Sequence, residues 1–183
     1  MGGFLWKPKI RIIYAKDWSY KLKQCIEIIP KSEAEKLYAK KHSFVVVAEQ
    51  NIKLFCIIEF NNRYIYVCFF DKYNRNYLNY EYYIYNYDNL FLNKLFLNRY
   101  YFEVDIKIAV LQYAFTPEGD YRMEYIMDGR KVSETGNKID TAILWEKYPK
   151  FDNYSKLIET EKKYKIIRRK IKKNNDGMYG TIV

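Results

Sequence analysis

The chain of 183 residues is long enough for one domain with its own hydrophobic core. Aromatic residues make up 19% of it and charged residues 30%, a composition that excludes a generally disordered protein. Residues 1–41 and 161–183 each carry six surplus positive charges and residues 42–160 carry two surplus negative ones, so the net charge of +10 does not by itself predict a nucleic-acid-binding body.

The first part of the chain predicts strands and one short helix. Ser32 and Glu35 have the spacing of a capping box, which opens a helix to about residue 41. Apolar segments bounded by turn residues predict strands at residues 9–14, 24–29 and 43–49.

A hairpin is predicted where residues 52–60 and 63–70 flank two asparagines, because asparagine tolerates the positive φ of a tight turn. A two-residue loop would pair Ile58 with Ile65 across the two strands. Both faces of this hairpin are largely apolar. Something must therefore cover the second face as well: a helix, another sheet or a partner.

Tyrosine is concentrated in residues 64–87, where nine of 24 residues are tyrosine. It favours strands and is enriched at protein interfaces, where it supplies a large contact area at low entropic cost. Residues 77–87 alternate as a strand, with Leu78, Tyr80, Tyr82 and Ile84 on the face expected to pack inward. An A/T-rich genome would produce a similar tyrosine content without selection for binding, and the composition leaves that alternative open.

Further along the chain, Asp88 is predicted to cap a helix that ends near residue 98. Residues 101–115 are apolar and predict a long strand, although their length would also suit a helix. Asp128-Gly129 lies between two short strand patterns and predicts a type I′ hairpin turn.

The last part predicts a C-terminal helix over residues 153–173, followed by a frayed tail at residues 174–183. The sequence thus predicts a single α+β domain over residues 1–173, with a mostly antiparallel sheet, helices packed on one side and a C-terminal helix.

The sequence shows no recognisable catalytic or metal-binding motif. His42 is the only histidine and has no carboxylate near it in sequence, and the glycines are too scattered for a phosphate-binding loop. The carboxylates between residues 118 and 140 fit a solvated hairpin. We therefore expect a protein that is not an enzyme and needs no catalytic residue, metal or cofactor.

The cysteines and the N-terminus indicate the compartment. Cys25, Cys56 and Cys68 have neither metal-site spacing nor a disulfide framework, which indicates a reducing environment. Basic residues follow the short apolar start, so no signal peptide is predicted, and no apolar run approaches the roughly 18 residues of a membrane span. We expect a cytoplasmic protein that does not associate with a membrane.

Residues 115–158 carry a family resemblance. They read Phe-Thr-Pro-Glu-Gly-Asp-Tyr at 115–121, Asp-Gly-Arg at 128–130, Lys-Ile-Asp at 138–140, Trp-Glu-Lys-Tyr-Pro at 145–149 and Phe-Asp-Asn-Tyr-Ser-Lys-Leu at 151–157. This segment resembles the C-terminal part of immunity proteins, small cytoplasmic bacterial proteins encoded beside polymorphic toxins. The resemblance implies inhibition of a cognate protein toxin by binding. Inhibitors of nucleases are usually acidic, so this basic chain suggests either another kind of toxin or a contact made by the near-neutral body.

The predicted partner-binding surface is the outward face of the tyrosine-rich strand. It consists of Tyr77, Tyr83, Tyr85 and Tyr87, with Arg75 near its edge. Tyrosine and arginine dominate the energetics of protein interfaces. The competing interpretation is that the protein's own helices cover both faces.

A nucleic-acid-binding module is the alternative function. Residues 162–173 contain eight basic residues in twelve, which could contact phosphates while exposed tyrosines stack on bases. A solvated helix face would explain the same run of charges.

Overall fold

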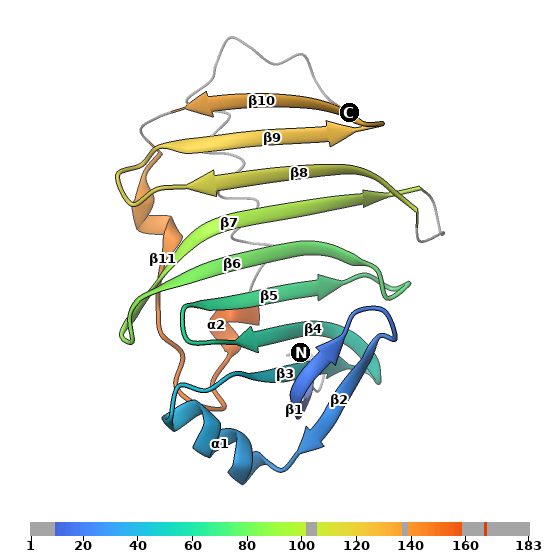
Figure 1. Cartoon of the computed structure of the whole chain (residues 1–183), viewed down its shortest axis with the longest axis vertical. Helices are drawn as coiled ribbons and strands as arrows, with labels where there is room; N and C mark the ends of the chain where they lie inside the picture. The colour runs from blue at the N-terminus through green and yellow to red at the C-terminus, as the bar shows by residue number, and fades with distance from the viewer. Residues whose placement is uncertain (1–9, 102–105, 137–138, 159–166, 168–183) are drawn as a thin grey trace, which may run out of the picture.

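The computed structural model describes residues 10–101, 106–136, 139–158 and 167. Within these residues, eleven strands form one sheet in the order β10-β9-β8-β7-β6-β5-β4-β3-β1-β2, and β11 pairs with β7 outside this path (Figure 1). All neighbouring strands are antiparallel.

The strands are β1 (Ile10–Ser19), β2 (Gln24–Ile29), β3 (Phe44–Gln50), β4 (Lys53–Phe60), β5 (Tyr64–Phe70), β6 (Asn76–Asn86), β7 (Asn89–Tyr100), β8 (Lys107–Phe115), β9 (Tyr121–Met127), β10 (Arg130–Gly136) and β11 (Trp145–Lys147). The helices are α1 (Lys31–Ala39), the short 3-10 helix η1 (Thr141–Leu144) and α2 (Ser155–Ile158). Helix α1 agrees closely with the predicted extent of the helix, but the predicted capping box does not form. The N-cap residue is Pro30, and no side chain caps the first turn.

The predicted α+β class is wrong. The described part of the chain is mostly a large antiparallel sheet with only two short α-helices, and no layer of helices packs on one side of it. The predicted helix after Asp88 is instead strand β7. Its apolar spacing is misleading because a β-bulge at Asn93 shifts the alternation: Leu92 pairs with Tyr82 and Lys94 with Glu81. A bulge inserts one residue, so apolar positions three apart face the same side as they would in a helix.

The β4–β5 hairpin forms with a different register from the predicted one. Ile58 pairs with Val67, two positions beyond the predicted Ile65. The Asn61 side chain explains the longer loop, because its Oδ1 accepts hydrogen bonds from the backbone N–H groups of Arg63 and Tyr64 at 2.8 and 2.7 Å. A shift of two residues keeps every side chain on its predicted face.

The hairpin turn predicted at Asp128-Gly129 is present in the structure. Asp128 and Gly129 have φ of 50° and 74°, which confirms the predicted type I′ conformation. Strand β8 confirms the strand predicted in the apolar segment 101–115 only from Lys107 onward, since the chain turns between the end of β7 at Tyr100 and the start of β8. The Tyr101 N–H donates to the Ile106 carbonyl at 2.9 Å where the chain reverses.

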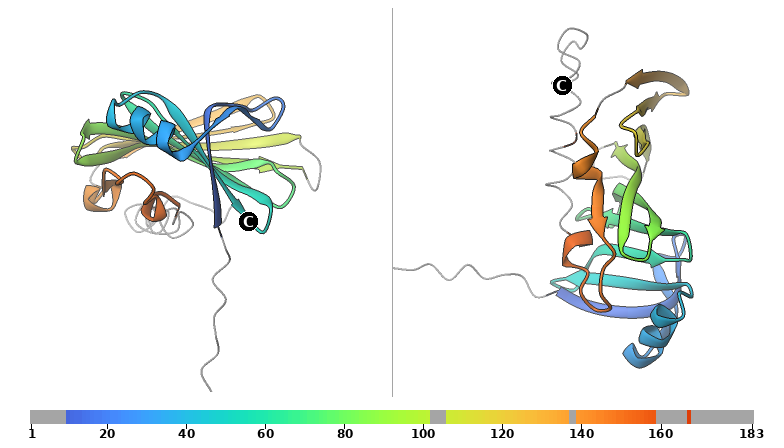
Figure 2. Two further views of the ribbon diagram at one scale, coloured as in Figure 1. Left: turned by 90° about the horizontal axis from the view of Figure 1, so that it is seen from below. Right: turned by 90° about the vertical axis from the view of Figure 1, so that its left-hand side faces the viewer.

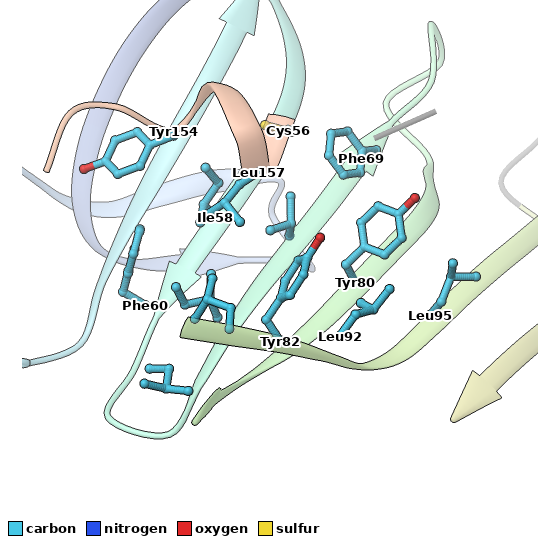
Figure 3. Packing of buried hydrophobic residues seen from close by; sticks show 14 of the residues in the cluster. Cys56, Ile58, Phe60, Phe69, Tyr80, Tyr82, Leu92, Leu95, Tyr154 and Leu157 are labelled. Atoms are coloured by element: carbon cyan, nitrogen blue, oxygen red, sulfur yellow. The ribbon is translucent and has the colours of Figure 1, made fainter. Parts of the chain in front are cut away.

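The main core lies between one face of the sheet and residues 139–158, which we call the strap. The strap crosses this face from the β8–β10 side towards β1 and α1 (Figure 2). Tyr154, just before α2, and Leu157, within α2, lie over β4 and β5 (Figure 3). The Tyr154 ring lies 5.6 Å from the Phe60 ring. Ile167 is also fully buried in this core. Apart from Ile167, which is helical as predicted, the predicted C-terminal helix beyond residue 158 lies outside the described residues, as do the domain boundary at residue 173 and the tail at 174–183.

The β1–β2 hairpin covers part of the second face of the sheet, in front of β3 and β4 in Figure 1. Trp18 of β1 packs against Val47, Ile57 and Cys68 in a smaller hydrophobic cluster. The Tyr20 hydroxyl donates a hydrogen bond to the Glu59 carboxylate and lies 3.2 Å from the Cys68 sulfur. Part of the apolar second face of the β4–β5 hairpin is therefore covered by strands of the same sheet.

Candidate protein-binding surface

An aromatic ladder crosses four neighbouring strands on the second face of the sheet. It consists of Tyr64 on β5, Tyr83 on β6, Phe91 on β7 and Trp145 on β11, each directly opposite the next in register. Residues opposite one another in antiparallel strands project from the same face. The Tyr64 and Tyr83 rings are 5.6 Å apart, and the Phe91 and Trp145 rings are 5.0 Å apart. The strap thus contributes one rung of the ladder.

Two further tyrosines extend the ladder. The Tyr85 ring stands edge-on to Trp145, with their centroids 5.3 Å apart, and the Tyr66 ring lies 6.0 Å from Tyr64. Tyr83 is 42% exposed and Tyr85 is 59% exposed. Phe91 is buried. The ladder therefore presents aromatic rings to solvent from a rigid, hydrogen-bonded sheet.

A partly buried ion pair lies beside the ladder. Glu81 is only 6% exposed, and its carboxylate accepts hydrogen bonds from Asn93 Nδ2 at 2.9 Å and Lys94 Nζ at 3.0 Å. Tyr66 is opposite Glu81 in register. Burial, followed by the nearby Glu81 carboxylate, raises the pKa of Tyr66. The sequence places Glu81 on the wetter side of the strand, but the lysine and asparagine shield it from solvent.

The structure brings together only part of the predicted site. Tyr83 and Tyr85 lie together at the ladder, and Tyr87 is 45% exposed in the adjoining β6–β7 turn. Tyr77 is partly buried against the main core. Arg75 is buried next to the start of β6. At roughly 3.3 Å per strand residue, Arg75 and Tyr77 lie on the order of 30 Å from Tyr87.

Arg75 has a structural set of contacts. Its guanidinium forms an ion pair with Asp71 at 2.6 Å and lies over the rings of Tyr73 and Tyr100 at 4.8 and 4.9 Å. Burial alone would raise the pKa of Asp71, but the hydrogen bonds from Arg75 and nearby backbone N–H groups outweigh it and lower that pKa. These contacts hold the β5–β6 loop together.

The partner-binding surface predicted from the sequence did not include Tyr64, Tyr66 or Trp145. Tyr64 and Tyr66 are within the tyrosine-rich block, and strand alternation alone could have placed them on one face. Trp145 could not be placed in this way, because it reaches the ladder only through the pairing of β11 with β7.

The cysteine thiols are held in their protonated form. Burial raises the pKa of Cys68 to about 12, and burial also raises the pKa of Cys56 well above its usual value. Such thiols are poor nucleophiles, because the thiolate is the reactive form. Among the described residues, no three histidine, cysteine or carboxylate side chains come close enough together to bind a metal ion.

Comparisons with models of protein families, with curated proteins and with solved structures find no match for this chain. In the part of the chain that is described, no helix has the length and apolar character needed to cross a membrane.

Proposed function

We propose that this protein is a bacterial immunity protein, acting in the cytoplasm, that binds and inhibits a cognate protein toxin through the surface around the aromatic ladder. The observation that supports this most directly is the exposure of Tyr83 and Tyr85 on a ladder built from four strands. The strap that supplies Trp145 belongs to the segment resembling immunity proteins.

The contacts between the ladder rings lower the entropy cost of binding a partner. Ordering long, flexible side chains at an interface costs roughly 0.5–1.5 kcal/mol each. The ladder rings already contact one another in the free protein, with centroids 5.0–5.6 Å apart. A partner that packs on them therefore gains aromatic contact area with little further loss of side-chain freedom.

A double alanine variant tests this proposal. The Tyr83→Ala/Tyr85→Ala protein should bind the toxin encoded beside it about 30-fold more weakly or worse, since losing one hot-spot residue costs about 2 kcal/mol. Binding is measured by calorimetry and stability by thermal unfolding. Tyr101→Ala is the matched control, because Tyr101 is 52% exposed and lies just after the end of β7 that is farther from Tyr83 and Tyr85.

Unchanged toxin affinity in the double variant would refute the proposed surface. So would a large fall in melting temperature that fully accounts for the lost binding, because the tyrosines would then act as core residues. If the protein instead binds nucleic acid with an affinity that falls steeply with salt concentration, the alternative function is favoured, since phosphate contacts release counterions.

A further inference from the structure

Three tyrosine rings surround the ammonium group of Lys41. Its Nζ lies 4.9 Å from the centroid of Tyr38, 4.5 Å from that of Tyr87 and 4.9 Å from that of Tyr148. The rings come from α1, from the β6–β7 turn and from the strap after β11. We call Tyr38, Tyr87 and Tyr148 the tyrosine cage. Cation–π attraction operates within about 6 Å of a ring centroid, so all three rings act on the same charge.

The cage walls are held by contacts that do not involve Lys41. The Tyr148 N–H donates to the Asp88 carbonyl at 2.9 Å, which joins the strap to the β6–β7 turn. The Tyr38 hydroxyl donates to the Pro149 carbonyl at 2.6 Å, which joins the strap to α1. The Tyr87 and Tyr148 rings also meet edge to face at 5.7 Å. The cage should therefore keep its shape when its cation is removed.

Lys41 enters the cage from a strained backbone position. It has a φ of 59° and follows Lys40, the C-cap residue of α1. The Lys41 N–H donates to the Tyr38 carbonyl at 3.0 Å, and the His42 N–H donates to the Leu37 carbonyl at 2.9 Å. This is the left-handed helix end at which glycine is the usual residue, since a side chain there is strained by about 1 kcal/mol. Within the described residues, no carboxylate forms an ion pair with Lys41. The aromatic rings are the contacts that favour a lysine at this position.

The cage is accessible and adjoins the aromatic ladder. Tyr87, one of its walls, is 45% exposed, and Lys41 is only partly buried. Tyr85 of the ladder is two residues away in the same strand-and-turn segment. A partner that docks on the ladder would therefore meet the cage at the border of the contact.

We propose that the tyrosine cage is an exchangeable cation site, filled by Lys41 in the free protein and by a lysine side chain of the protein partner in the complex. The identity of the partner rests on the proposed function, whereas the affinity of the cage for an ammonium group does not. Exchange replaces one ammonium group by another over the same three rings, so the cation–π attraction is kept while Lys41 moves into solvent. The other contacts of the interface then determine whether exchange occurs.

Emptying the cage tests the site directly. Lys41→Gly removes the internal cation and suits the left-handed backbone. Choline is the probe, and 3,3-dimethylbutan-1-ol, a neutral molecule of the same shape, is its control. Choline should bind Lys41→Gly at least about tenfold more tightly than the neutral analogue, as expected for cation–π recognition by several rings. Wild type and Lys40→Ala, which removes a neighbouring charge, should bind choline at least about tenfold more weakly than Lys41→Gly, because Lys41 still fills the cage.

These experiments test the cation site separately from the proposed toxin-inhibiting function. Equal binding of choline and its neutral analogue, or no binding to a folded Lys41→Gly protein, overturns the cation site whatever the toxin assay shows. Choline binding that survives Tyr148→Leu in the Lys41→Gly background also overturns it. Should Lys41→Gly fail to fold, Lys41→Asn replaces it, since asparagine also tolerates this backbone. If choline binds as expected but Tyr83→Ala/Tyr85→Ala leaves toxin affinity unchanged, the cation site stands and the proposed function fails.

Discussion

Replacing Leu157 by alanine should destabilise the protein substantially, although this residue is in a helix of only four residues. Leu157 is 1% exposed and packs into the main core from the strap side (Figure 3). Leucine-to-alanine changes in well-packed cores cost about 3 kcal/mol, from lost burial plus the cavity left behind. With a urea dependence of about 2 kcal/mol per molar, the midpoint of unfolding should fall by about 1.5 M.

The matched control is Lys156→Ala, which changes an exposed neighbour in the same short helix. It should change the free energy of unfolding by less than about 0.5 kcal/mol. Urea titrations followed by tryptophan fluorescence measure both variants. If Leu157→Ala shifted the midpoint no more than Lys156→Ala, the strap would not be an integral part of the core, and its contribution to the aromatic ladder would lose its structural basis.

Two further predictions concern the ends of the strap. Gly119→Ala should destabilise the protein by about 2 kcal/mol, because φ there is 101° and a Cβ would lie 2.9 Å from the Ile139 carbonyl oxygen. Gly129→Ala should destabilise the protein by only about 1 kcal/mol, because φ there is 74° but no atom lies within 4 Å of the added Cβ. Thermal unfolding measures both variants, and an equal loss of stability in the two would contradict this explanation. The hydrogen bond from Lys31 lowers the pKa of Asp152 below its unfolded-state value, so this carboxylate stabilises the fold above about pH 4 and loses that contribution as pH falls through its folded pKa. Asp152→Asn should therefore show a smaller loss of stability between pH 7 and pH 3 than wild type in denaturant titrations, and an unchanged loss would exclude this contribution.

The candidate site was only partly predictable from sequence. Strand alternation correctly separated the outward Tyr83 and Tyr85 from the inward Tyr80 and Tyr82. The same alternation grouped them with Tyr77, which instead packs against the main core at the irregular start of β6. A pattern of period two holds only while the pairing is regular, and β6 has register shifts near both ends.

The sequence by itself determined those elements that depend only on residues close together in the chain. The Asp128-Gly129 turn is of this kind, because turn geometry depends on its two central residues. Helix α1 forms over nearly the predicted range although no side chain caps its start. The helix predicted after Asp88 failed because the bulge at Asn93 depends on the pairing of β7 with β6, which local spacing does not encode. The tertiary structure alone decided that the strap crosses the sheet, bringing Trp145 to Phe91 and Tyr148 to Lys41. These contacts join segments more than 50 residues apart in the sequence, so no local pattern could specify them.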